Sequence, residues 1–242
     1  MATDHQELIK QLKDTLYTEP CIDHERYPLA MEFCEGVLTI AGEVDDVATK
    51  KRALYRMAAF PQIRDIVDRI QVSPAEIMGD GAICAHVSDA MLQEPAFLNF
   101  SLTARLGPQT ELIRERVCDR CGAIEVSVEA GVVTLAGQVP SLSHKRLAGV
   151  LSWWVPGSRD VINMLVVEPP EEDTDDEISD AVRLVLEKDP FVNPLQVRIR
   201  TRNRVVTLDG LLPSESERDM AESDAWYVLG VDNVINRIAV SA

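Results

Sequence analysis

The chain has 242 residues, 46% of them hydrophobic, and a net charge of -16. This hydrophobic content excludes a disordered chain. The acidic balance argues against general nucleic-acid binding, which depends on Lys and Arg to neutralise phosphates. No apolar run approaches the roughly 20 residues that span a bilayer, and the start of the chain, Met1–Leu8, lacks the basic and apolar regions of a secretory signal. We therefore expect a cytoplasmic protein with no transmembrane segment and with reduced thiols at its five cysteines.

Residues 1–72 form the first predicted module. Helical spacing of apolar residues predicts helices over about 6–16 and 45–59, and strand patterning predicts strands over 29–34, 37–41 and 64–72. The dipeptide Glu35-Gly36 is suited to a tight hairpin turn between the first two strands. A linker, Ser73-Pro74-Ala75-Glu76, follows this module.

Residues 80–167 form the second predicted module, which is longer than the third. Between Glu94-Pro95 and Gly137 it has about 22 residues more than the third module has between Asp189-Pro190 and Gly210. The extra residues lie near 96–120, and the pattern predicts a short helix over 110–120. The sequence leaves open whether this helix is an insertion or replaces the first helix of the module. The acidic, proline-rich linker Glu168–Asp176 is expected to be extended and solvated.

Residues 175–242 form the third module, and its pattern is the clearest. Residues 176–188 have helical spacing, and Asp189-Pro190 ends that helix. Strands are predicted from Val197 and over 205–209 and 234–240, and a second helix is predicted over 213–228. Gly230 is suited to a C-cap for that helix. The order of elements is therefore α-β-β-α-β.

One segment occurs in all three modules. It reads GVLTIAG at 36–42, GVVTLAG at 131–137 and RVVTLDG at 204–210. A second signature begins 23 residues after each closing glycine, at Asp65, Asp160 and Asn233. Self-similarity of this kind indicates a repeat architecture. We predict an α+β fold of three tandem α-β-β-α-β modules, each a small three-stranded sheet with two helices on one face.

These signatures, together with the turns Pro156-Gly157 and Leu229-Gly230, resemble the BON domain. This family is named for osmotically induced periplasmic and nodulation proteins, and the resemblance covers nearly the whole chain apart from the extra residues of the second module. It implies kinship with proteins that are usually envelope or stress proteins. Some members bind phospholipid, and some cytoplasmic relatives bind potassium. The family brings no catalytic residues.

Candidate catalytic and metal chemistry is sparse. Cys118 and Cys121 form one C-x-x-C, without the second pair that a zinc ribbon requires. The four histidines share no spacing, and the chain has no G-x-S-x-G, P-loop or H-E-x-x-H motif. We predict no enzymatic activity, no cofactor and no metal site.

A basic row is the first candidate binding surface. Because side chains alternate along a strand, Arg198, Arg200 and Arg202 are expected on one side of the first hairpin strand of the third module, with Arg204 extending the row. The other modules have Glu32 and Glu125 on the corresponding face. The row is either a solvated sheet face or a site for an anion or an acidic surface, for which the planar guanidinium is well suited.

Aromatic residues near the end of the second helix in the second and third modules form the other candidate surface. The residues expected to bind a partner there are Leu147, Val150, Trp153, Trp154, Trp226 and Tyr227. A helix that is apolar on two sides is usually buried on two sides. The alternatives are packing of one module on another, or on the extra residues of the second module, and an exposed patch for a protein partner, a second copy of the chain or lipid.

The sequence therefore predicts a non-enzymatic binding or scaffolding protein that acts through module surfaces, with self-association through sheet faces or edges as one route. One alternative is binding to a phospholipid surface through Trp153 and Trp154 with help from Arg198 to Arg204. Another is a potassium- or other cation-binding stress protein, for which oxygen-rich loops and the negative charge are permissive.

Overall fold

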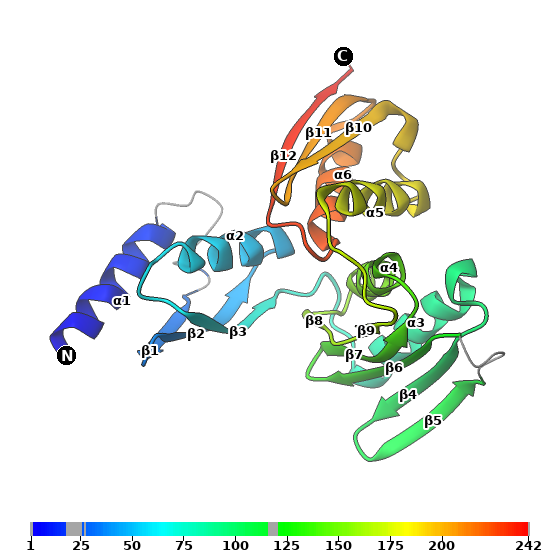
Figure 1. Ribbon diagram of the computed structural model, residues 1–242, viewed down its shortest axis with the longest axis horizontal. Helices are drawn as coiled ribbons and strands as arrows, with labels where there is room; N and C mark the ends of the chain where they lie inside the picture. The colour runs from blue at the N-terminus through cyan, green and yellow to red at the C-terminus, as the bar shows by residue number, and fades with distance from the viewer. Residues whose placement is uncertain (1, 18–25, 27, 116–120, 242) are drawn as a thin grey trace. The chain divides into compact units, whose positions relative to one another are not determined.

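The computed structural model describes residues 2–17, 26, 28–115 and 121–241 (Figure 1). The chain forms two compact units, one up to Ser73 and the other from Pro74 onward. Within the described residues, no helix is long and apolar enough to cross a membrane. The predicted fold class is confirmed: the chain is α+β, with small mixed sheets and packed helices in three repeated modules.

The first unit contains one module. Its elements are α1 (Ala2–Tyr17), β1 (Ala30–Cys34), β2 (Val37–Val44), α2 (Val47–Ala58) and β3 (Asp65–Val72). The central strand β2 pairs antiparallel with β1 and parallel with β3. Leu38 and Ile40 of β2 are fully buried, as are Leu12 of α1 and Met57 of α2.

The second unit contains the other two modules. The third module has the same plan, with α5 (Asp175–Lys188), β10 (Val197–Arg202), β11 (Val205–Leu212), α6 (Glu215–Tyr227) and β12 (Asn233–Val240). A 3-10 turn, η2 (Pro194–Gln196), leads directly into β10. The sheet order is β10-β11-β12, with β11 and β12 parallel.

The second module keeps this plan and enlarges the sheet. Its repeated elements are α3 (Asp80–Gln93), η1 (Pro95–Phe97), β6 (Ala123–Glu129), β7 (Val132–Val139), α4 (Leu142–Trp153), β8 (Asp160–Asn163) and the short β9 (Val166–Val167). The extra residues add a hairpin of β4 (Ser101–Leu106) and β5 (Gln109–Arg114). Among the described residues the strands run β5-β4-β6-β7-β8, with β9 also paired to β7.

Two predictions about the second module are wrong. The helix expected over 110–120 is strand β5 over its first part, while residues 116–120 lie outside the described residues. The sheet of this module is six-stranded rather than three-stranded. Because α3 is present, the hairpin is an insertion and replaces no helix.

The hairpin turn in each repeated segment has two successive residues of positive φ. These pairs are Glu35 and Gly36, Ala130 and Gly131, and Asn203 and Arg204. Type I′ turns require this conformation because it matches the twist of the flanking strands. In the third module the Asp175 carboxylate accepts hydrogen bonds from the backbone N–H groups of Asn203 (2.7 Å) and Arg204 (2.9 Å). These bonds lower the pKa of Asp175, and Asp80 holds the turn of the second module in the same way.

Candidate binding surfaces of the second unit

Helix α4 is covered on two sides. Ala148 and Val155 lie in the core of the second module. Trp154 packs against the same core, and its Nε1 donates a 2.9 Å hydrogen bond to Asp224 of α6. The Trp153 ring stacks on Tyr227 of α6, with 6.0 Å between ring centroids. The two-sided apolar pattern of α4 therefore corresponds to packing of the second module on the third.

The six residues predicted to bind a partner lie at or near this packing. Leu147, Val150 and Trp226 are buried, whereas Trp153, Trp154 and Tyr227 are half-buried. Leu147 belongs to the core of the second module and not to the surface on which a partner was expected. The three buried side chains do not form an exposed patch, and both indoles contact the third module of their own chain.

A buried arginine joins the two modules through the linker. The side chain of Arg146 is 1% exposed, its Nε donates a 3.0 Å hydrogen bond to the Leu229 carbonyl, and its Nη2 pairs with Asp173. The other Asp173 oxygen accepts from Arg204 at 3.1 Å. A buried cation is tolerated only when it is paired in this way, so breaking the pair is costly. The linker is exposed, as expected, but Asp173 fixes it to both modules.

A buried carboxyl lies at the same interface. Asp224 is 3% exposed and its Oδ1 accepts from Trp154. Burial raises the pKa of Asp224 to about 8; the Trp154 hydrogen bond opposes this rise, and the negative charge of Asp189 and a side-chain hydrogen bond with Asp189 add to it. An ion pair of 2.8 Å between Lys188 of α5 and Glu94 also joins the modules.

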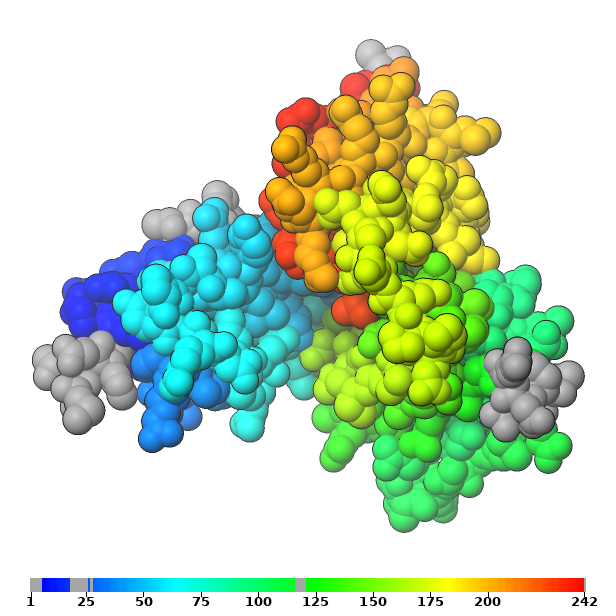
Figure 2. Space-filling view, in the orientation of Figure 1, coloured from blue at the N-terminus to red at the C-terminus, as the bar shows by residue number. Residues whose placement is uncertain are grey.

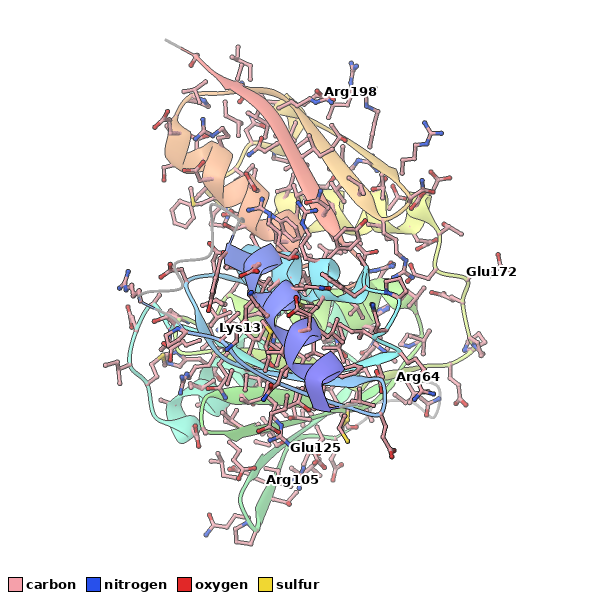
Figure 3. All side chains as sticks on the ribbon, turned by 90° about the vertical axis from the view of Figure 1, so that its left-hand side faces the viewer. Lys13, Arg64, Arg105, Glu125, Glu172 and Arg198 are labelled. Carbon is pink, nitrogen blue, oxygen red and sulfur yellow. The ribbon has the colours of Figure 1, made fainter. Side chains whose placement is uncertain are left out.

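The basic row lies on the open face of the third sheet. Arg198, Arg200 and Arg202 are exposed and alternate with the inward-facing Val197 and Ile199, as predicted. Figure 3 shows Arg198 projecting away from this sheet.

The charge of this face is set by its arginines and by one acidic residue. Arg200 makes a 2.6 Å ion pair with Asp209 of β11. Arg237 of β12 is exposed on the same face. Arg204 departs from the row, because it pairs with Asp173. The face therefore carries more arginine than acid on a chain that is strongly acidic.

A hollow of about 500 Å³ opens beside the first residues of β10. It lies between α5, η2 and β10, and its lining includes Arg183, Leu195, Val197, Arg198, Ile199 and Asp209. Leu195, which lines this hollow together with Arg198, is 95% exposed, so an apolar side chain borders the arginines. Figure 2 shows the β10–β11 segment, coloured orange, at the surface of the molecule.

Residues with potential catalytic or metal chemistry have structural contacts. Ser141 Oγ lies 2.6 Å from His144 Nδ1, but this hydroxyl caps α4 and the His144 ring stacks on Phe100. Within the described part of the chain, no group of three or more His, Cys, Asp or Glu residues is placed to hold a metal ion. Cys121 is disulfide-bonded, so the expectation of reduced thiols is wrong there; Cys118 lies outside the described residues.

Comparison with known proteins identifies the class. The sequence model of the BON domain matches residues 109–169 and 174–242, which is more than half of the chain. The chain therefore belongs to the BON domain family. A search of curated proteins gives no match.

Two solved structures are similar over most of their length. Both are of CdsD, described as a structural protein of the type III secretion system of Chlamydia trachomatis. One has 14% identity over 97% of this chain and 92% of that chain, with a TM-score of 0.25. The other, of the C-terminal domain, has 13% identity over 97% and 98%, also with a TM-score of 0.25.

Sequence reasoning missed the polar residues of the interface. Asp224 follows Ala221 by three residues, so it falls on the core stripe of α6, and a carboxyl on that stripe was the available signal. Arg146 had no such signal, because a basic residue near the start of an amphipathic helix is ordinarily solvated. Its role depends on Asp173 and Leu229, which no local pattern connects to it.

Proposed function

We propose that this protein is a non-enzymatic binding or scaffolding module that recognises an acidic protein partner through the open face of the β10-β11-β12 sheet. The observation that carries the proposal is the exposed row Arg198, Arg200 and Arg202, joined on the same face by Arg237. Arginine forks pair carboxylates with two hydrogen bonds. Charge-assisted bonds of this kind contribute about 1.5 to 3 kcal/mol each when they are shielded from water.

The net charge of -16 favours a compact partner over an extended anionic surface. A membrane or a nucleic acid would meet the repulsive field of the whole chain, whereas a protein segment meets only the basic face. The phospholipid alternative relied on Trp153 and Trp154, and both indoles are engaged with the third module. An acidic protein surface therefore has the stronger support.

Self-association is a second candidate, supported by Glu32. This residue is exposed on β1, so it could meet the arginine face of a second copy. Glu125 is a weaker candidate, because Arg105 already neutralises it at 2.8 Å. Exposed ion pairs contribute only about 0 to 1 kcal/mol each, so an acidic partner with several carboxylates fits the row better than one Glu32.

Fluorescence anisotropy with labelled poly-L-glutamate tests the proposal. The triple variant Arg198→Glu, Arg202→Glu and Arg237→Glu is expected to bind the probe at least about tenfold more weakly than the parent, and binding by the parent should weaken as salt is added. Arg69→Glu is the matched control, because Arg69 holds on β3 the position that Arg237 holds on β12. Equal loss in the control variant, or tighter binding to phosphatidylglycerol vesicles than to poly-glutamate, would contradict the proposal.

A further inference from the structure

The second module has an additional strand beside the first strand of its repeated hairpin, whereas in the third module the equivalent strand lies at the edge of the sheet. Inserted strand β4 pairs in parallel with β6, from Ser101 opposite Ala123 to Arg105 opposite Ser127. The third module has β10 in the place of β6, and η2 leads into it with no insertion. Among the described residues, β10 pairs with β11 alone. Figure 1 shows β4 beside β6 and no corresponding strand beside β10.

The first helices of the second and third modules differ at two matching positions. On α3 these are Gly81, where an added Cβ would lie 3.9 Å from Leu106 of β4, and Ser88, which is buried. The equivalent positions on α5 hold Asp176 and Arg183, and Arg183 is 50% exposed and lines the hollow beside β10. The space that β4 fills in the second module is therefore open in the third.

Charge defines what would fit this space. Across β4 and β6, Arg105 Nε lies 2.8 Å from Glu125 Oε1, so the added strand carries the charge opposite to that of the edge strand (Figure 3). On β10 the positions of Glu125, Ser127 and Glu129 are held by Arg198, Arg200 and Arg202. A strand that complements β10 is therefore acidic on its outward face.

We propose that the groove between α5 and the edge of β10 accepts an extended segment of a partner protein, added parallel to β10 as a fourth strand. The segment alternates acidic residues, which face Arg198 and Arg200, with apolar residues, which face the hollow beside Val197 and Ile199. Backbone hydrogen bonds to the free edge supply affinity and the alternating side chains supply specificity, as in other cases of strand addition. This proposal rests on the proposed function, because it names the kind of partner that the same basic face recognises.

Pairing of β10 with β10 of a second copy is disfavoured. It would bring the arginines of the two strands together, and like charges on facing strands destabilise a sheet. An unpaired edge of this kind is a template that proteins either cover or use. In the second module the chain covers it with β4.

The chain itself supplies the probe. A labelled peptide of residues 99–107 carrying Ser101→Glu, Thr103→Glu and Arg105→Glu keeps the inward residues Leu102, Ala104 and Leu106 of β4 and makes its outward face acidic. The full chain is expected to bind this peptide, and Arg198→Glu with Arg200→Glu is expected to weaken binding more than about tenfold. Arg237→Glu, on the far strand of the same face, should change binding less than about twofold if the peptide lies at the β10 edge.

Backbone methylation separates strand addition from attraction to the face. Two further peptides carry N-methyl groups, one at 101, 103 and 105 and the other at 102, 104 and 106. In a strand, alternate N–H groups point to opposite sides, so one of the two peptides is expected to lose binding and the other to keep it. Equal binding by both would overturn strand addition while leaving recognition by the basic face intact.

Two other outcomes would also overturn the proposal. The first is no binding of the acidic peptide by the folded parent chain, with folding verified by circular dichroism. The second is a concentration-dependent assembly of the chain that the peptide dissociates, because a second copy and not a partner protein would then occupy the groove. The matching peptide with Lys at the same three positions should not bind.

Discussion

A single residue in the second signature fastens the last strand of each module to the second helix. Asn163 Nδ2 donates to the Lys145 carbonyl at 2.7 Å, and Asn236 Nδ2 donates to the Arg218 carbonyl at 3.2 Å. In the first module this position is Asp68, which cannot donate from an ionised carboxylate. In this module the helix side chain donates to the strand instead. Nζ of Lys50, the residue equivalent to Lys145, lies 2.9 Å from Asp68 and donates to the Ile70 carbonyl at 2.7 Å.

Lys50→Met is expected to destabilise the first unit by about 1 to 3 kcal/mol, because it removes the cation that pairs with Asp68 and leaves the buried Ile70 carbonyl without the Lys50 donor. Adding Asp68→Asn should recover part of the lost stability. An asparagine at this position can donate a hydrogen bond to the backbone carbonyl of residue 50, as Asn163 donates to the carbonyl of Lys145. The urea midpoint followed by circular dichroism measures both changes. The three tryptophans, Trp153, Trp154 and Trp226, lie in the second unit, so their fluorescence transition should not move. Additive effects of the two substitutions would contradict this account.

Asp224 makes the stability of the second unit depend on pH. Its pKa rises from 3.8 to about 8 on folding, so between these values the folded state holds a proton that the unfolded state releases. Stability from this group is fully present below pH 3.8 and is lost as pH rises toward 8. The lowered pKa of Asp175 acts in the opposite sense and at lower pH, where its stabilising contribution is lost as the carboxylate protonates.

Asp224→Asn should remove this dependence while keeping an oxygen for Trp154. Relative to the parent, the variant is expected to gain stability with rising pH by at most about 1.4 kcal/mol per pH unit over that window. Urea midpoints followed by tryptophan fluorescence across the pH range measure the difference. Parallel pH profiles for the two proteins would show that Asp224 is ionised in the folded state.

At the scale of the elements, the closing glycine of the repeated segment lets the first strand approach the second. A Cβ on Gly137 would lie 2.1 Å from the Ala123 carbonyl oxygen, and its φ is +118°. On Gly210 the same distance to the Gln196 carbonyl oxygen is 2.1 Å. These contacts give a physical reason for the glycine that ends the segment in the second and third modules.

Gly137→Ala is expected to destabilise the second unit by about 1 to 3 kcal/mol, because the backbone must move and the positive φ is strained for alanine. Gly81→Ala is the control. It is the second residue of α3, and an added Cβ would have its nearest neighbour at 3.9 Å, so alanine should fit there without loss of stability. The tryptophan fluorescence midpoint in urea measures both. A Gly137→Ala protein as stable as the parent would contradict the close-approach explanation.

The sequence predicted the repeated elements because their signals are local. Helical and strand periods, the turn at Glu35-Gly36 and the closing glycines need no distant partner to be read. The inserted hairpin was missed although Ser101–Leu106 alternates and Gly107-Pro108 marks a turn, because the following residues also fit a short helix. The arginine row was predictable from alternation, whereas the hollow beside β10 was not, since it depends on a strand that one module has and the other lacks.

At the scale of the second unit, two BON modules form one compact unit, and their sheets end differently on the side of the first hairpin strand. Arg146, Asp173 and the Trp154–Asp224 bond hold the modules together. The second module covers its own edge with β4, while the third presents an open edge beside a basic face. This asymmetry is what makes the third module the binding end of the unit in our proposal.

Residue-resolved amide hydrogen exchange on the full chain, without and with the acidic peptide of residues 99–107, tests this claim most directly. In the free protein, alternate amides of β10 that point away from β11 should exchange fast, whereas amides of β6 should be protected on both sides by β4 and β7. The peptide should slow exchange of those β10 amides and leave β6 unchanged. Outward amides of β10 that are protected in the free protein, or that the bound peptide does not protect, would contradict the claim.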